Sequence, residues 1–183
     1  MNSNSDQKRE RLSQGFVHVY TGQGKGKSTA ALGLTLRAAG AGLRVFLAQF
    51  LKCGQFSEIK ALKRFDDLVT VRQYGSGGFI KDQPEEKDFA LARQGLEETR
   101  QALLSGEYDM VIMDEANVAV HHGLFGPKAL VDMIDQKPKH VELIITGRHA
   151  DKRVIEKADL VTELLEVKHY YSEGTSARKG VEF

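Results

Sequence analysis

The amino-acid sequence predicts a three-layer α/β fold, in which helices cover both faces of a mostly parallel central sheet. Short runs of β-branched and aliphatic residues alternate along the chain with longer stretches that favour helices, the pattern of repeated strand–helix–strand units. Most of these runs are apolar throughout, as expected for strands that are buried on both faces.

Six segments are predicted to be strands, because each is a short run rich in Val, Ile, Leu or Phe. They are residues 16–20, 44–50, 69–73, 110–114, 141–146 and 160–167. The intervals between them are expected to hold helices. In a parallel sheet such connections place the carboxyl ends of all strands at one edge.

The clearest helix is predicted for residues 84–104, where Phe89 and Leu96 belong to an apolar set that recurs near helical spacing. Pro84 suits the first turn of this helix, and Gly106 is expected to end it. The preceding segment, residues 74–83, is rich in glycine and predicts an irregular loop. This loop contains Phe79 among its apolar residues, which suggests a lid over a binding site.

Length and composition predict a single domain. The 183 residues, 41% of them hydrophobic, are enough for one well-buried core and too few for two full-sized domains. Residues 1–14 are polar and charged and predict a flexible N-terminal arm, so the folded domain is expected over residues 15–183.

The charge balance and the single cysteine limit the classes of partner. A net charge of +1 provides no long-range field for nucleic acid or for an anionic membrane, so neither partner is expected. No segment has the roughly 20 apolar residues of a membrane span. Cys53 is the only cysteine, which excludes an internal disulfide and favours a reducing, cytoplasmic location.

A glycine-rich turn lies between the first predicted strand and a segment that favours a helix. It reads Gly22-Gln23-Gly24-Lys25-Gly26-Lys27-Ser28, followed by Thr29. Glycines let successive N–H groups face phosphate oxygens, and the following helix directs its positive end at the same anion. We therefore predict a phosphate loop that binds a nucleoside triphosphate, with Lys27 on the terminal phosphates and Ser28 on Mg²⁺. The usual pattern has glycine at the position of Thr21, so the loop departs from a standard ATPase.

A second signal agrees with a phosphate-loop NTPase (RecA-like) fold. The predicted strand at residues 110–114 ends in Asp114, which Glu115 follows. In such folds a carboxylate at a strand end holds Mg²⁺ or its water ligands. Asp114 and Glu115 are therefore candidate metal-binding residues. These two signals leave the chemistry open, because kinases, hydrolases and other transferases all stabilise phosphate charge similarly.

Several segments together resemble the ATP:corrinoid adenosyltransferases, a phosphate-loop family, and the resemblance spans nearly the whole predicted domain. The segments are Tyr20–Ala31, Gln49–Lys52, Asp114–Glu115, Ile145–Arg148, and the ending from Val167 to His169 and from Lys179 to Phe183. The alternating glycines of the loop, which depart from the ATPase pattern, are similar to the loop of this family.

The resemblance implies an alkyl-type transferase that moves the 5′-deoxyadenosyl group of ATP to the Co(I) of a corrinoid and releases triphosphate. The implied partners are ATP as co-substrate, Mg²⁺, a corrinoid and a reduced flavoprotein as electron donor, and a homodimer is implied as well. No protein nucleophile is needed, in agreement with the lack of a recognisable Ser-His-Asp arrangement.

Residue roles follow from the same resemblance. Residues from Gly22 to Ser28 match the triphosphate loop, with Thr29 adjacent, and Ser28 and Glu115 match the Mg²⁺ positions, with Asp114 in support. Arg37 and Arg148 match arginines that contact ATP, and Phe79 matches an aromatic residue over the corrinoid. Relatives often have a tryptophan close to this aromatic, whereas this chain has none. The ending is expected to close the nucleotide pocket.

Competing interpretations remain open at this stage. Arg37 is equally compatible with an exposed position on a helix, and Arg148 with a capping role. The pair His121 and His122 lacks further metal-ligand spacing and is expected to be solvated. For the whole chain the alternatives are a nucleoside or small-molecule kinase and an ATP-dependent nucleic-acid-binding module, which the neutral charge disfavours.

Overall fold

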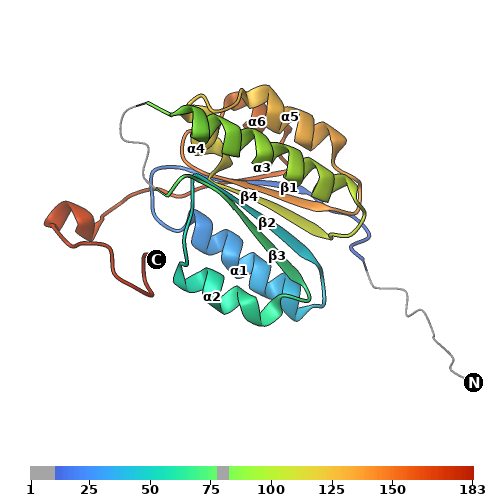
Figure 1. Ribbon diagram of the computed structural model, residues 1–183, viewed down its shortest axis with the longest axis horizontal. Helices are drawn as coiled ribbons and strands as arrows, with labels where there is room; N and C mark the ends of the chain where they lie inside the picture. The colour runs from blue at the N-terminus through green and yellow to red at the C-terminus, as the bar shows by residue number, and fades with distance from the viewer. Residues whose placement is uncertain (1–10, 78–82) are drawn as a thin grey trace, which may run out of the picture.

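The computed structural model describes residues 11–77 and 83–183, and within them six strands form one sheet (Figure 1). The strands are β1 (Val17–Thr21), β2 (Val45–Phe50), β3 (Val69–Tyr74), β4 (Met110–Asp114), β5 (Glu142–Thr146) and β6 (Leu160–Glu163). Their order across the sheet is β3-β2-β4-β5-β1-β6, and every neighbouring pair is parallel. The predicted fold class is confirmed, with a sheet that is wholly parallel in the described residues.

Helices cover both faces of the sheet and make the outer two layers (Figure 1). On one face lie α1 (Lys27–Gly40) and α2 (Ser57–Leu62), with the short 3₁₀ helix η1 (Lys63–Phe65) after them. On the other face lie α3 (Glu86–Leu104), α4 (Ala116–His121), α5 (Pro127–Gln136) and α6 (Lys152–Lys157). A second 3₁₀ helix, η2 (Tyr170–Glu173), follows the sheet in the C-terminal segment.

Each face of the sheet has its own apolar core, because successive side chains of a strand point to opposite faces. In β2, Phe46 and Phe50 pack beneath α3, whereas Val45 and Leu47 pack beneath α1. Every residue of β2 and β4 is buried. The uniformly apolar runs in the sequence are therefore central strands, as predicted.

Five of the six predicted strands agree with the structure within one residue at each end. The sixth prediction, residues 160–167, was wrong in length, because β6 ends at Glu163. This strand lies at the edge of the sheet and all four of its residues are exposed. After it the chain leaves the sheet, and Val167 is 93% exposed.

The boundaries of α3 follow from its capping groups. The helix begins at Glu86, and Glu85 and Asp88 form a reciprocal capping box, with the Glu85 amide donating to the Asp88 carboxylate. Pro84 precedes this cap, so its predicted place in the first turn was wrong. The C-cap is Ser105, and Gly106 follows with a φ of 72°, which agrees with its predicted role at the end of the helix.

The parallel arrangement places the functional segments at one edge of the sheet. Gln49 near the end of β2 pairs in register with Asp114 at the end of β4. Strand β5 separates β4 from β1, so Thr146 at its end lies between the acidic pair and the phosphate loop. Ligands of open parallel sheets bind at this edge.

Some predictions fall outside or at the margin of the described residues. Residues 1–10 of the predicted arm and Phe79 of the predicted lid lie outside them. Within the arm, Arg11 donates to the carbonyl of Gly106. No helix in the described ranges has the length and hydrophobicity to cross a membrane.

Candidate functional site

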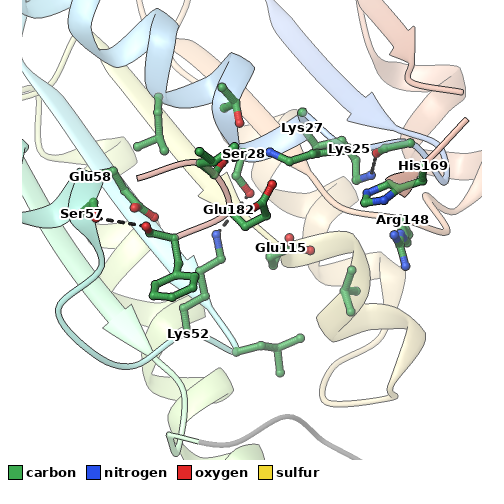
Figure 2. A pocket seen from close by; sticks show the side chains of 18 of the residues that line it. Lys25, Lys27, Ser28, Lys52, Ser57, Glu58, Glu115, Arg148, His169 and Glu182 are labelled. Carbon is green, nitrogen blue, oxygen red and sulfur yellow. Dashed lines mark hydrogen bonds between the residues drawn. The ribbon is translucent and has the colours of Figure 1, made fainter. Parts of the chain in front are cut away.

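A cavity of about 700 Å³ opens at the carboxyl ends of the strands. Its lining combines the phosphate loop, the ends of β2, β4 and β5, and the last residues of the chain. Figure 2 shows the side chains of Lys27, Ser28, Glu115 and Arg148 around this cavity, with Lys52 reaching in from the end of β2. Five segments that are distant in the sequence therefore meet in one site.

The alternating glycines of the loop are required by its packing against the chain after β6. A Cβ atom on Gly22 would lie 2.4 Å from the carbonyl oxygen of Leu164, and one on Gly24 would lie 2.6 Å from that of Leu165. The Gly24 amide instead donates to the Leu164 carbonyl over 2.7 Å. Gly22 and Gly26 also have positive φ angles of 94° and 116°.

Thr21 belongs to β1 rather than to the turn, and its main-chain carbonyl accepts from the Leu164 amide. The position that is glycine in the usual motif is therefore a buried strand residue in this chain. The departure from the usual motif at Thr21 therefore has a structural reason. The loop is held against the chain segment that follows β6.

Lys27 is the first residue of α1, and its side chain folds back over the loop. Its Nζ donates to the carbonyls of Gly22 at 2.8 Å and Gly24 at 2.6 Å. Burial and the nearby Arg148 lower the pKa of the Lys27 ammonium, while Glu115 opposes this effect. An ammonium group and a helix N-terminus thus converge on the centre of the loop, an arrangement suited to an anion.

Asp114 is 1% exposed and accepts hydrogen bonds on both carboxylate oxygens. Its Oδ1 accepts from Ser28 Oγ at 2.8 Å and from Thr146 Oγ1 at 2.7 Å. Its Oδ2 accepts from Lys52 Nζ at 2.7 Å and from Gln49 Nε2 at 3.2 Å. Four donors therefore surround this carboxylate, as a buried charge requires.

Lys52, Gln49 and Thr146 have no role in the sequence-based prediction, although all three lie in segments that carry the family resemblance. Lys52 Nζ also lies 3.2 Å from Ser28 Oγ. Burial lowers the pKa of the Lys52 ammonium, but the charge and hydrogen bond of Asp114 outweigh it and the net shift is upward. The signal that could have identified these three residues in the sequence was their position at the carboxyl ends of neighbouring strands.

Glu115 has the left-handed backbone conformation, with a φ of 62°. This conformation is costly for a side chain other than glycine, and it is typical of functional sites. The Glu115 amide donates to Thr146 Oγ1 at 3.0 Å, and its side chain lines the cavity. Burial, followed by the charge of Asp114, raises the pKa of the Glu115 carboxyl.

Ser28 and Glu115 offer a hydroxyl and a carboxylate oxygen to the cavity, which is the donor chemistry that Mg²⁺ prefers. No cluster of three or more His, Cys, Asp and Glu side chains suited to a metal occurs in the described part of the chain. Mg²⁺ commonly uses one or two protein oxygens together with phosphates and water, so these two residues fit that mode.

The remaining predicted residues divide into those at the cavity and those away from it. Lys25, Thr29 and Arg148 line the cavity, and Arg148 follows Gly147, whose φ is 129°. Gln23 is exposed and does not line the cavity. Arg37 is exposed in the last turn of α1, so the structure does not bring it to the site within this chain.

The last residues of the chain form part of the cavity wall. Lys25 Nζ donates to the Val181 carbonyl and Ser57 Oγ to the Phe183 carbonyl, each over 3.0 Å. The Glu182 carboxylate accepts from Tyr170 OH and from the Arg178 amide. Hydrogen bonds from the Arg178 guanidinium, and next from Tyr170 OH, lower the pKa of the Glu182 carboxyl to about 2. The terminal segment is thus folded on itself against the phosphate loop.

The histidine pair lies near the cavity. His122 lines it, and His121 stacks on His149 with ring centroids 4.0 Å apart. Burial, then the neighbouring His121 and Arg148, lower the pKa of the His149 imidazole. His121 is exposed, as predicted.

Known proteins that are similar to this chain are corrinoid adenosyltransferases. Residues 13–183 match the family model described as ATP:corrinoid adenosyltransferase BtuR/CobO/CobP. A corrinoid adenosyltransferase of Pseudomonas aeruginosa is 35% identical over 174 residues, covering 94% of this chain and 86% of the relative. One from a Sinorhizobium species is 33% identical, covering 93% and 81%. One from Escherichia coli K12 is 32% identical, covering 93% and 86%.

Proposed function

Since this chain belongs to the ATP:corrinoid adenosyltransferase family, we propose that its cavity holds ATP and Mg²⁺ while the 5′-deoxyadenosyl group passes to a corrinoid. The observation that carries the proposal is the convergence of Lys27, Ser28, Glu115 and Arg148 on one cavity (Figure 2). The kinase and nucleic-acid-binding alternatives are not favoured by the family match.

The reaction is a displacement at the 5′ carbon of the ribose. The electron pair of Co(I) forms the new cobalt–carbon bond, and the bond between that carbon and the phosphate oxygen breaks. Triphosphate leaves with the electron pair of the broken bond. The protein supplies no nucleophile in this scheme, so its task is to orient the two substrates and to stabilise the developing charge of triphosphate.

The loop and its cations are suited to that task. The N-terminus of α1, the Lys27 ammonium and the Arg148 guanidinium all face the cavity, as does Lys25. Fixed positive groups that are aimed at a leaving anion stabilise it without the cost of reorientation during the reaction. In the proposed complex Lys27 exchanges its bonds to the Gly22 and Gly24 carbonyls for phosphate oxygens.

For Mg²⁺ we propose Ser28 and Glu115 as protein ligands. When bound, the ion would neutralise phosphate charge. Asp114 is assigned the supporting role, because both of its oxygens already accept hydrogen bonds. By accepting the Ser28 hydroxyl hydrogen, Asp114 leaves the lone pairs of that oxygen available to the ion.

Two further partners belong to the proposal. Formation of Co(I) needs an electron donor, and we assign this role to a reduced flavoprotein, as the family resemblance implies. The family resemblance supports a homodimer. By the same resemblance we assign Arg37, exposed on α1, a contact with ATP, and Phe79 a place over the corrinoid.

Product analysis tests the proposal directly. The protein, ATP, Mg²⁺ and cob(I)alamin are expected to yield adenosylcobalamin and inorganic triphosphate in equal amounts. Formation of ADP without a cobalt–carbon bond would instead support the kinase alternative. Hydrolysis stimulated by polynucleotide would support the nucleic-acid-binding alternative.

A further inference from the structure

We propose that the Lys52 ammonium occupies the place of the divalent cation until a triphosphate arrives, so that the cation binds productively only together with triphosphate. The inference rests on the proposed function, in which Ser28 is a Mg²⁺ ligand. It concerns Lys52, which has no part in the proposed reaction.

The contacts of Lys52 place its positive charge beside Ser28 Oγ, a proposed Mg²⁺ ligand, and beside the Asp114 carboxylate that supports it. Its Nζ lies 2.7 Å from Asp114 Oδ2 and 3.2 Å from Ser28 Oγ. Figure 2 shows the Lys52 side chain extending from below into the cavity toward Ser28. A cation bound to Ser28 with Asp114 in support would face this ammonium at short range.

Mg²⁺ and the Lys52 ammonium cannot both hold Ser28 Oγ. Mg²⁺ binds oxygen at about 2.0–2.1 Å, closer than an ammonium group does. Two positive charges at such separations repel each other, and this repulsion is strong where water is partly excluded. The Asp114 carboxylate is 1% exposed, whereas the Lys52 side chain is 22% exposed, so Lys52 is the partner that can move.

The backbone beside Lys52 indicates that the ammonium does more than complete the hydrogen bonds of a buried carboxylate. Leu51 has a φ of 61° and so belongs, with Glu115, to the few non-glycine residues in the left-handed region. That conformation directs the chain after β2 toward the cavity at a cost in backbone energy. Asp114 has three other hydrogen-bond donors besides Lys52. A lysine that reaches the cavity is therefore not required for hydrogen bonding alone.

Binding of triphosphate removes the competition between the Lys52 ammonium and the divalent cation. It supplies additional oxygen ligands to the cation and also gives the displaced ammonium a new anionic partner in the same cavity. Lys52 is thus a positioning residue that makes metal and nucleotide binding cooperative. The cooperativity follows from linkage. Once one ligand has displaced Lys52, the other binds without the free-energy cost of that displacement.

The experiment measures Mn²⁺ binding to the intact protein by electron paramagnetic resonance, first without any nucleotide and then with inorganic triphosphate. Lys52→Met removes the charge, Lys52→Gln removes it while keeping a hydrogen-bond donor, and Lys52→Arg keeps it. Lys60→Met, an exposed lysine of α2, is the matched control. Two neutral variants protect the test against failure of either one to fold.

Without triphosphate, the neutral variants are expected to bind Mn²⁺ at least tenfold more tightly than the unmodified chain. Lys52→Arg and Lys60→Met are expected to stay within threefold of it. With triphosphate present this advantage is expected to disappear, since Lys52 then contributes to triphosphate binding. Rescue by arginine separates this role from a purely structural one.

Unchanged or weaker Mn²⁺ binding in both neutral variants would overturn the Lys52 inference and leave the proposed cation site standing. If no variant bound Mn²⁺ even with triphosphate, the proposed cation site itself would be overturned, and the inference with it.

Discussion

The Thr146 hydroxyl donates to Asp114 Oδ1 over 2.7 Å, and this bond ties the end of β5 to the end of β4. The Thr146 hydroxyl oxygen also accepts a hydrogen bond from the Glu115 amide at 3.0 Å. One buried hydroxyl thus orients the carboxylate that supports Ser28 and fixes the strained residue that follows it. The candidate metal site depends on a side chain that bears no charge.

Replacement of Thr146 by Val retains its shape but removes both hydrogen bonds. We expect the free energy of unfolding to fall by about 1–3 kcal/mol, because the Glu115 amide and one acceptor site of Asp114 lose their partner. Chemical denaturation measures this change. Thr35→Val is the matched control, since within the described part of the chain the buried Thr35 hydroxyl bonds only to the Ala31 carbonyl in its own helix. Equal losses in both variants would contradict a special role for Thr146.

Lys27→Met is expected to lower kcat/KM for ATP by roughly 100- to 1000-fold, since it removes a charged donor aimed at the leaving triphosphate. Adenosylcobalamin formation measures the rate, and calorimetry measures ATP affinity. Lys139→Met, at an exposed lysine before β5, should retain full activity. A Lys27→Met variant with unchanged affinity and rate would refute the assignment of the loop.

Gly24→Ala is expected to destabilise the fold by about 1–3 kcal/mol, because its Cβ atom would lie 2.6 Å from the Leu165 carbonyl oxygen. Gly33→Ala provides the control within α1, where a Cβ meets no atom within 4 Å. That substitution is expected to stabilise the helix by roughly 0.5–1 kcal/mol. Thermal unfolding of both variants measures the contrast, and a stabilising Gly24→Ala would disprove the packing explanation of the alternating glycines.

Glu115→Gln is expected to change stability in a pH-dependent way. Burial and Asp114 raise the pKa of the Glu115 carboxyl above its ordinary value of 4.5. A carboxyl group with a raised pKa stabilises the fold fully below 4.5, and this contribution is lost as the pH rises through the folded-state pKa. The variant should therefore gain stability relative to the unmodified chain at pH values above that pKa.

Melting temperatures at acidic and alkaline pH, compared between the two proteins, measure this gain. Glu156→Gln, at an exposed glutamate of α6, is the control for the loss of one carboxylate. A Glu115→Gln variant that is less stable than the unmodified chain at alkaline pH would contradict the expected sign. The same variant is expected to lose Mg²⁺ affinity if Glu115 is a ligand.

Removal of residues 181–183 is expected to raise KM for ATP about fivefold, because the cavity loses part of its wall and the Val181 carbonyl no longer orients Lys25. Global stability should change little, since these residues are largely exposed. Val167→Ala, at a 93% exposed residue of the same segment, is the control and should leave KM unchanged. A lower KM after truncation would indicate that the ending obstructs the nucleotide instead.

Local sequence patterns predicted those features whose causes are local. Continuous apolar runs identified the buried strands, and the order of glycines, Lys27 and Ser28 after the first strand identified the phosphate loop. The acidic pair at the end of β4 was recognised because a strand end is a short-range signal. Exposed edge positions were harder to predict, and the sixth strand was drawn too long because Leu165 and Val167 are apolar although the chain has left the sheet there.

By itself, the sequence determined the fold class, the phosphate loop and the family. Hydrophobic pattern and glycine spacing act over a few residues, so both can be read along the chain. Only the tertiary structure decided that Lys52, Gln49 and Thr146 surround Asp114, and that Leu164 braces the loop. These contacts join residues that are distant in the sequence, and they form because parallel strands bring their carboxyl ends to one edge of the sheet.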